Sequence, residues 1–162
     1  MATSNFGNAI AEKCNIPIKE TAVGFKNFRP FLAPSSKEKA IVAYEESDGI
    51  TIQNHTLEKD ALIGVLTAIA MILDKQMNLT EILKEVQDEY GTFYPERGGQ
   101  EVDRDLTGQP LIDKLKHLAT YEIGTSLLIG NIEKKIVDLI TSDGYKFVFL
   151  DQSWLLIRPS GT

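Results

Sequence analysis

The chain has 162 residues, of which 43% are apolar and 25% are charged, and its net charge is −6 at pH 7. This composition is typical of a globular protein and gives no indication of disorder. The negative charge argues against nonspecific nucleic-acid binding, which needs a basic face, but it allows one locally basic pocket for a small phosphorylated ligand.

A short amphipathic helix is predicted over residues 4–14, with Ser4 as its N-terminal cap. The apolar residues that recur at helical spacing are Phe6, Ile10, Ala11 and Cys14. Cys14 is the single cysteine, so no internal disulfide can form, which suits a reducing compartment. We expect its side chain to be small, apolar and buried.

Two extended segments follow, and each ends in polar residues. Residues 16–25 are predicted to be extended, and Lys26 lies just beyond them, either as a solvated lysine or as a ligand contact. Residues 39–44 predict a short apolar strand that continues into a turn with three carboxylates, among them Glu45, and a serine, Ser47. Carboxylates at a strand end can accept hydrogen bonds from vicinal sugar hydroxyls, or they can form an ordinary solvated turn.

Two helices are predicted next, over residues 58–75 and 79–90. Lys59 places a cation in the first turn of the former, where the helix dipole favours anions, so its position is either accidental or explained by a nearby anion. His55, just upstream, lacks the paired histidines or cysteines that zinc prefers, and we predict no metal site there.

The pattern changes near residues 91–100, where we place a domain boundary. A helix is predicted over residues 109–119, and residues 121–131 are ambiguous. Three strands are then predicted as a β-meander: residues 135–140, 145–150 and 154–157.

The meander leads into a polar turn at the end of the chain. Arg158 can grip two oxygens of a phosphate or carboxylate, Ser160 and Thr162 add hydroxyl donors, and Gly161 lets the backbone approach closely. The turn is therefore either an anion-binding loop or an ordinary polar turn at a strand end. Because no further element would hold such a loop, we expect either a tail or part of a longer protein.

Three segments occur in a characteristic order: Val23-Gly24-Phe25-Lys26, then Tyr44-Glu45-Glu46-Ser47-Asp48-Gly49 with His55 and Glu58-Lys59-Asp60, then Arg158-Pro159-Ser160-Gly161-Thr162. Together they resemble the C-terminal half of the α-D-phosphohexomutases, the phosphoglucomutase and phosphomannomutase family. The resemblance covers nearly the whole chain. The sequence departs from the family at Tyr44 and Asp48, so it does not select one hexose.

The resemblance implies a fold of class α/β plus α+β. Residues 1–95 would form most of the third family domain, a sugar-binding α/β/α domain with a mixed sheet whose N-terminal strand is missing. Residues 96–162 would begin the fourth, phosphate-binding α+β domain, which would be truncated.

The resemblance also implies roles for individual residues. Glu45 and Ser47 would bind sugar hydroxyls and Lys59 would approach the phosphate ester. The cleft around the sugar would also be lined by Gly24, Lys26 and His55. The nonreacting phosphate would be held by the terminal loop of Arg158, Ser160, Gly161 and Thr162.

As implied by the resemblance, the full-length protein would be an isomerase that interconverts hexose 1-phosphate and hexose 6-phosphate. It would use a phosphoserine, Mg²⁺ and a hexose 1,6-bisphosphate intermediate. The phosphoserine segment and the aspartate-rich metal loop do not occur in these residues, so we expect this piece alone to be inactive and to depend on N-terminal domains of the same chain. The alternative is a non-catalytic module that binds or senses a phosphosugar.

The location of the protein is predicted from two further features. The longest apolar run, residues 62–73, is too short to span a bilayer, and residues 1–14 lack the basic and apolar blocks of a signal peptide. We therefore expect a cytoplasmic protein with no membrane or nucleic-acid partner.

Overall fold

The computed structural model describes residues 2–159, and the chain divides into two compact units, Met1–Glu96 and Arg97–Thr162. Both units mix helices with antiparallel strands, in agreement with the predicted α/β and α+β classes. Each unit is described separately below.

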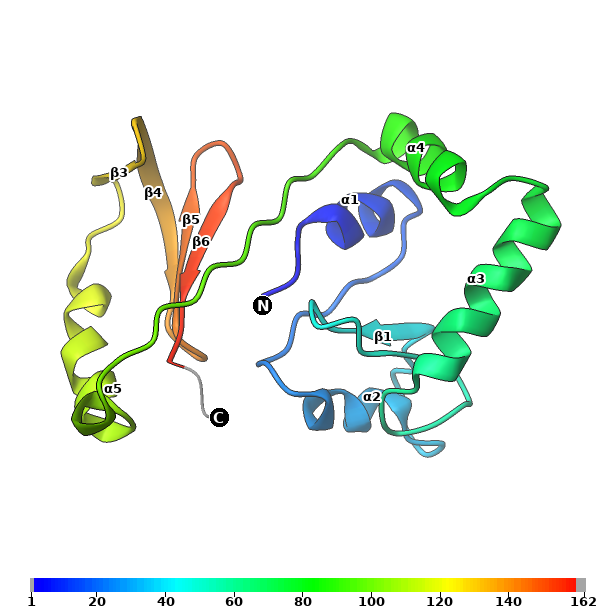
Figure 1. The fold of residues 1–162 in the computed structure, drawn as a ribbon, viewed down its shortest axis with the longest axis horizontal. Helices are drawn as coiled ribbons and strands as arrows, with labels where there is room; N and C mark the ends of the chain where they lie inside the picture. Colours follow the sequence, from blue (N-terminus) through cyan, green and yellow to red (C-terminus); the bar gives the residue numbers. More distant parts are fainter. Residues whose placement is uncertain (1, 160–162) are drawn as a thin grey trace. The chain divides into compact units, whose positions relative to one another are not determined.

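The first unit contains a two-stranded sheet and several helices (Figure 1). In chain order its elements are α1 (Phe6–Lys13), the 3-10 helix Phe25–Phe28, α2 (Arg29–Leu32), β1 (Val42–Tyr44), β2 (Ile50–Ile52), α3 (Ala61–Lys75) and α4 (Leu79–Tyr90). Strands β1 and β2 form an antiparallel hairpin in which Tyr44 pairs with Ile50, so the acidic turn closes this hairpin. Ala43 and Thr51 point into the small core of this unit, and the Thr51 side chain is fully buried.

Helix ends in the first unit follow from their capping residues. Asp60 caps α3 by accepting a hydrogen bond from the backbone N–H of Leu62 at 2.9 Å. Helix α4 begins with a reciprocal capping box, in which Asn78 accepts from the backbone of Glu81 and the Glu81 side chain accepts from the backbone of Asn78. It ends at Gly91, as predicted.

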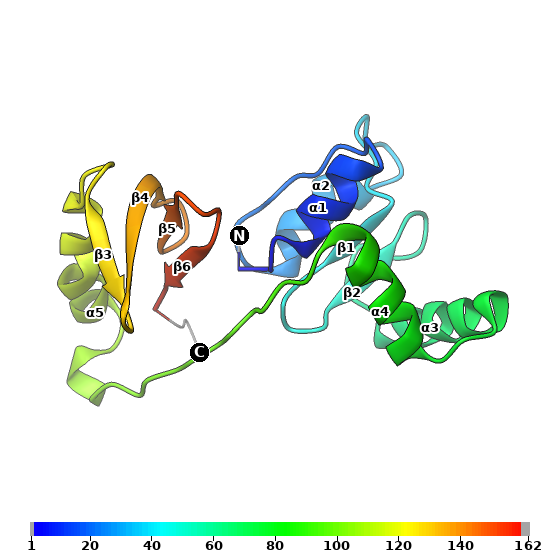
Figure 2. The same cartoon turned by 90° about the horizontal axis from the view of Figure 1, so that it is seen from above.

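Helix α1 lies beside α4, as two views of the ribbon show (Figures 1 and 2). The Lys13 ammonium donates to the backbone carbonyl of Glu89 at 2.7 Å, and the rings of Phe6 and Phe93 lie 5.7 Å apart. The Cys14 sulfur lies 3.8 Å from the Tyr90 hydroxyl. Cys14 is exposed, so the prediction that it is a buried apolar residue was wrong.

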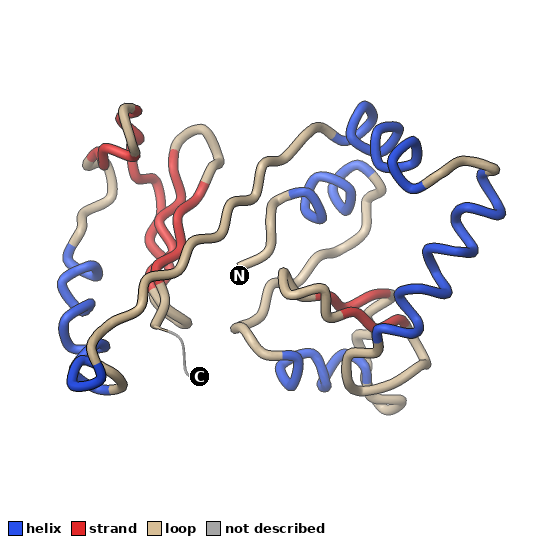
Figure 3. The backbone as a smooth tube through the Cα atoms, viewed as in Figure 1, coloured by secondary structure: helices blue, strands red, loops and turns tan. Residues whose placement is uncertain are grey.

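The second unit is a four-stranded antiparallel meander with helix α5 (Gln109–Leu115) beside it (Figures 1 and 3). Its strands are β3 (Ser126–Ile129), β4 (Ile132–Ile140), β5 (Tyr145–Phe149) and β6 (Trp154–Ile157), in that order across the sheet. Ile136, Phe147, Phe149 and Leu118 form its core. The predicted helix over residues 109–119 divides into α5 and the 3-10 helix Lys116–Thr120, from which Leu118 reaches the core.

Helix α3 leaves much of its apolar surface exposed, although its sequence predicts a buried face. None of its residues is buried, and Leu62, Leu66 and Leu73 are each more than half exposed. Among the described residues, no single helix is long and apolar enough to cross a membrane. Helices α3 and α4 taken together have the length and apolar composition of a membrane span, but the chain bends by 81° between them.

Candidate functional site

Glu45, at the end of β1, is held in place by two groups from distant parts of the first unit. Its Oε1 accepts a hydrogen bond from the backbone N–H of Gly24 at 3.1 Å, and its Oε2 lies 3.4 Å from the Lys59 ammonium. The Glu45 side chain is only 9% exposed. A carboxylate this buried is stabilised by such charge-assisted contacts, so three residues that sequence analysis predicted for one site are in direct contact.

Lys59 is positioned by the start of α3. The next residue, Asp60, is the N-cap, and its backbone N–H donates to the carbonyl of Ile50 in β2 at 2.8 Å, which ties the helix start to the hairpin. The Lys59 side chain is about half exposed, whereas its partner Glu45 is nearly buried. The ammonium therefore keeps an open side that can attract an anion.

His55 contacts the residue that caps the same helix. Its Nε2 lies 2.7 Å from Oδ2 of Asp60. The hydrogen bond from His55, followed by that from the backbone N–H of Leu62, lowers the pKa of Asp60 below its ordinary value. His55 lies four residues before Lys59 along the chain and contacts Asp60, the cap residue that directly follows Lys59.

Gly49 closes the acidic turn and is a residue whose importance the sequence pattern did not reveal. A Cβ atom at this position would lie 2.7 Å from Cδ of Lys59 and 3.1 Å from Oε2 of Glu45. The Lys59 side chain would have to shift to make room for such an atom, so the missing side chain provides the space in which the Glu45–Lys59 pair forms. A predicted turn glycine is therefore also part of the site.

Tyr44, the last residue of β1, packs against α1. A Cβ atom at Gly7 would lie 1.8 Å from the Tyr44 hydroxyl oxygen, so the tyrosine occupies a notch in the helix that only glycine leaves open. Burial, followed by the charge of Glu20, raises the pKa of Tyr44 above its ordinary value. The hydroxyl therefore stays neutral and packs into the helix.

The remaining predicted sugar-site residues lie at the edge of this arrangement. Ser47 is exposed in the turn between β1 and β2, two residues after Glu45. Lys26 is exposed in the 3-10 helix that follows Gly24, with its Cε 3.9 Å from the position a Gly24 Cβ would take. Both are close along the chain to the Gly24–Glu45 contact, and their side chains face solvent.

The second unit carries the predicted phosphate anchor. Arg158 follows directly after β6 and is exposed. It lies beside Gly144 of the β4–β5 turn, where a Cβ would meet the Arg158 side chain at 3.0 Å. The other predicted members of this loop, Ser160, Gly161 and Thr162, lie outside the described residues.

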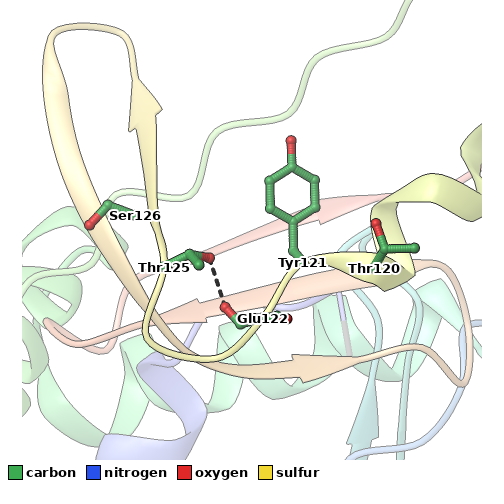
Figure 4. Close-up of a pocket in the computed structure, with 5 residues that line it drawn as sticks. All are labelled: Thr120, Tyr121, Glu122, Thr125 and Ser126. Atoms are coloured by element: carbon green, nitrogen blue, oxygen red, sulfur yellow. Dashed lines mark hydrogen bonds between the residues drawn. The ribbon is translucent and has the colours of Figure 1, made fainter.

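The predicted site as a whole forms neither of two cavities that lie among the described residues. A shallow pocket of about 320 Å³ in the second unit is lined by Thr120, Tyr121, Glu122, Thr125 and Ser126 (Figure 4). Its walls are held by the hydrogen bond from Thr125 to the carbonyl of Glu122, and it contains none of the predicted residues. A groove of about 960 Å³ in the first unit runs from α1 to Glu45 and is mostly apolar.

The acidic side chains do not form a metal site in residues 2–159. No group of three or more His, Cys, Asp or Glu side chains converges in this part of the chain. Glu45 is already engaged by Lys59, and Glu58 is paired with Arg29. These residues do not fit the oxygen-rich coordination that Mg²⁺ requires.

Comparison with known proteins identifies the family of this chain. Residues 1–90 match the family described as phosphoglucomutase/phosphomannomutase, alpha/beta/alpha domain III. The chain is 29% identical over 174 residues to a phosphoglucomutase of Rhizobium radiobacter, 27% identical over 183 residues to phosphoglucomutase 1, chloroplastic, of Marchantia polymorpha, and 27% identical over 178 residues to phosphoglucomutase-1 of Bos taurus.

These alignments include the whole of this chain but only part of each relative. They cover 100% of the chain in all three cases, and 31%, 27% and 31% of the respective relatives. The chain thus spans about three tenths of the length of the curated relatives it matches. Since the family match extends over more than half of the chain, the chain belongs to the phosphoglucomutase/phosphomannomutase family.

Proposed function

We propose that these residues are part of a phosphohexomutase that interconverts hexose 1-phosphate and hexose 6-phosphate through a bisphosphorylated sugar. The observation that carries the proposal is the Glu45 carboxylate, which is nearly buried and is fixed by Gly24 and Lys59. Family membership and the names of the relatives support the same reaction class.

In this proposal the first unit recognises the sugar. The Glu45 carboxylate has lone pairs beyond those engaged by Gly24 and Lys59, and two hydroxyls of a hexose can donate to them. Ser47 adds a hydroxyl from the same turn. Lys59, whose ammonium is half exposed, neutralises the phosphate ester of the bound sugar.

The second unit holds a phosphate through Arg158. A guanidinium can donate two parallel hydrogen bonds to one phosphate group, which fixes both its position and its orientation. Phosphoryl transfer depends mainly on such positioning and on charge neutralisation. The phosphoserine and the magnesium ion, which would neutralise charge on the transferring group, are assigned by this proposal to other parts of the full-length protein.

The proposal is tested by following the reaction of the full-length protein. Glucose 1-phosphate is supplied with Mg²⁺ and a trace of glucose 1,6-bisphosphate, and phosphorus NMR detects the appearance of glucose 6-phosphate. Mannose 1-phosphate is run in parallel to compare the two sugars. Conversion of either substrate supports a mutase. Tight binding without conversion would favour a non-catalytic phosphosugar-binding module, and absence of both would reject the proposal.

Arg158→Ala in the full-length protein should weaken phosphosugar binding and turnover by about 1.5 to 3 kcal/mol, the range expected when a charge-assisted hydrogen bond is lost. The measurement is kcat/KM for glucose 1-phosphate. Arg104→Ala, which removes an exposed arginine from the 3-10 helix Arg104–Leu106 of the same unit, is the control. Equal kinetics for wild type and Arg158→Ala would exclude the anchor role.

A further inference from the structure

Gly144, in the turn between β4 and β5, lies against the backbone and side chain that deliver Arg158. A Cβ atom built at Gly144 would be 2.8 Å from the carbonyl oxygen of Ile157 and 3.0 Å from Cβ of Arg158. The register of the sheet explains this closeness, because the next residue, Tyr145, pairs with Ile157. Gly144 therefore lies opposite Arg158 where the two strands end.

The obstruction at this position cannot be relieved by moving a flexible side chain alone. One of the close atoms is the backbone oxygen of Ile157, which is fixed by the pairing of β5 with β6. The other close atoms, Cβ and Cγ of Arg158 at 3.0 and 3.1 Å, lie at the root of its side chain. Any added side chain must therefore shift the end of β6 or redirect the arginine from its base.

The backbone of Gly144 adds a second constraint. Its φ of +93° is rarely adopted by residues with a side chain. Gly124, in the turn before β3, has a nearly identical φ of +96°, but a Cβ built there would meet no atom within 4 Å. The two glycines share the same backbone requirement, and only Gly144 has a close neighbour.

We propose that Gly144 is a positioning residue for phosphate binding, which sets the direction in which the Arg158 guanidinium leaves the sheet. The inference rests on the proposed role of Arg158 as the phosphate anchor. Gly144 itself touches no substrate. Because Gly144 has no side chain, Cβ and Cγ of Arg158 can lie close to it without a steric clash.

The test is a double-mutant cycle in the full-length protein, with glucose 1-phosphate and glucose 6-phosphate as calorimetric probes. Gly144→Ala should weaken binding about tenfold, and Arg158→Ala should do so by at least as much. If Gly144 acts only through Arg158, the double variant should bind no more weakly than Arg158→Ala alone, because the arginine that Gly144 positions is already absent.

Gly124→Ala controls for backbone strain, because it introduces the same positive-φ penalty without an obstruction. Backbone strain should lower the melting temperature of Gly124→Ala by about as much as it lowers that of Gly144→Ala. Gly124→Ala should nevertheless bind both probes as tightly as wild type does. Gly144→Asn provides a second variant if alanine prevents folding, since asparagine tolerates positive φ while still carrying a Cβ.

The outcomes separate this inference from the function on which it rests. The positioning role would be wrong if the losses of affinity from the two single substitutions multiplied in the double variant. It would also be wrong if Gly144→Ala and Gly144→Asn bound the probes as tightly as Gly124→Ala does. Either result would leave the anchor role of Arg158 intact. Unchanged binding by Arg158→Ala would overturn both. Weakened binding by a Gly144 variant that disappears in the Arg158→Ala background supports the inference.

Discussion

Glu45 and Lys59 illustrate how a pair of charged residues is fixed by residues that carry no charge. The carboxylate is 9% exposed and accepts a hydrogen bond from the Gly24 backbone, while Gly49 leaves space for the lysine stem. Burial of a carboxylate is costly unless charge-assisted contacts compensate for it. The site therefore depends on two glycines as much as on the ionised side chains.

Gly49→Ala should disturb this pair, because the new methyl group would lie 2.7 Å from Cδ of Lys59. Overpacking of this kind typically costs about 1 to 3 kcal/mol, and here part of that cost should appear as weaker binding of glucose 1-phosphate. Calorimetric titration and thermal denaturation of the full-length protein measure the two effects.

Gly99→Ala is the matched control, since a Cβ at Gly99 would meet no atom within 4 Å. Its binding and stability should equal those of wild type. Unchanged sugar-phosphate affinity in Gly49→Ala would show that the Glu45–Lys59 geometry does not matter for the ligand.

At the scale of elements, the turn between β5 and β6 is fastened to the neighbouring strand β4. The Lys134 ammonium contacts the Asp151 carboxylate and the Ser153 hydroxyl, and that hydroxyl donates to Asp151 at 2.6 Å. The hydrogen bond from Lys134, followed by that from Ser153, lowers the pKa of Asp151 from 3.8 to about 2. This turn begins the strand that leads to Arg158.

The lowered pKa of Asp151 predicts how its stabilising effect depends on pH. Because the folded pKa lies below the unfolded value, the contribution is complete above about pH 4 and is lost as the pH falls toward about 2. The difference in melting temperature between wild type and Asp151→Asn should therefore narrow over that range. Asp105→Asn, an exposed aspartate in the same unit, is the control, and a difference that stays constant with pH would contradict the prediction.

Elements with local signals could be predicted from the sequence, and those set by tertiary contacts could not. Helix α4 has the predicted bounds because Asn78 and Gly91 mark its ends through local hydrogen bonds. Helix α2 was not predicted, although Pro30 lies in its first turn, a position to which proline is well suited. Strand β2 was missed because its three residues are defined by pairing with β1.

In the candidate site, too, features that depend on tertiary contacts could not be predicted from local sequence patterns. The contact among Gly24, Glu45 and Lys59 could be anticipated only from the family resemblance, because these residues lie far apart in the sequence. The spacing roles of Gly49 and Gly144 could not be predicted, since they depend on which side chains lie beside each glycine.

At the scale of the whole molecule, α3 presents a continuous apolar stripe to solvent. Its members are Leu62, Leu66, Ile69 and Leu73, with exposed fractions of 63%, 51%, 47% and 64%. A group of neighbouring apolar side chains that are this exposed usually marks an interface. The curated relatives are about three times as long as this chain, so we expect other parts of the full-length protein to cover the stripe.

These residues expressed alone should therefore bind a hydrophobic dye strongly. The double variant Leu66→Gln/Ile69→Gln should reduce dye fluorescence because it interrupts the stripe. Ile123→Gln, which removes an exposed apolar side chain of the second unit outside the stripe, should have little effect. In the full-length protein the dye signal should be weak. Equal fluorescence from the isolated chain and the full-length protein would contradict a covering role for the remaining sequence.

The most direct test of the proposed sugar site compares two neighbouring carboxylates of the acidic turn. Glu45 is fixed by Gly24 and Lys59, and Glu46 is exposed. Calorimetric binding of glucose 1-phosphate to the full-length protein is measured for Glu45→Gln and Glu46→Gln. Glu45→Gln should weaken binding by about 1.5 to 3 kcal/mol while Glu46→Gln binds as wild type does. Equal affinities for wild type and Glu45→Gln would contradict the assignment of this turn to the sugar.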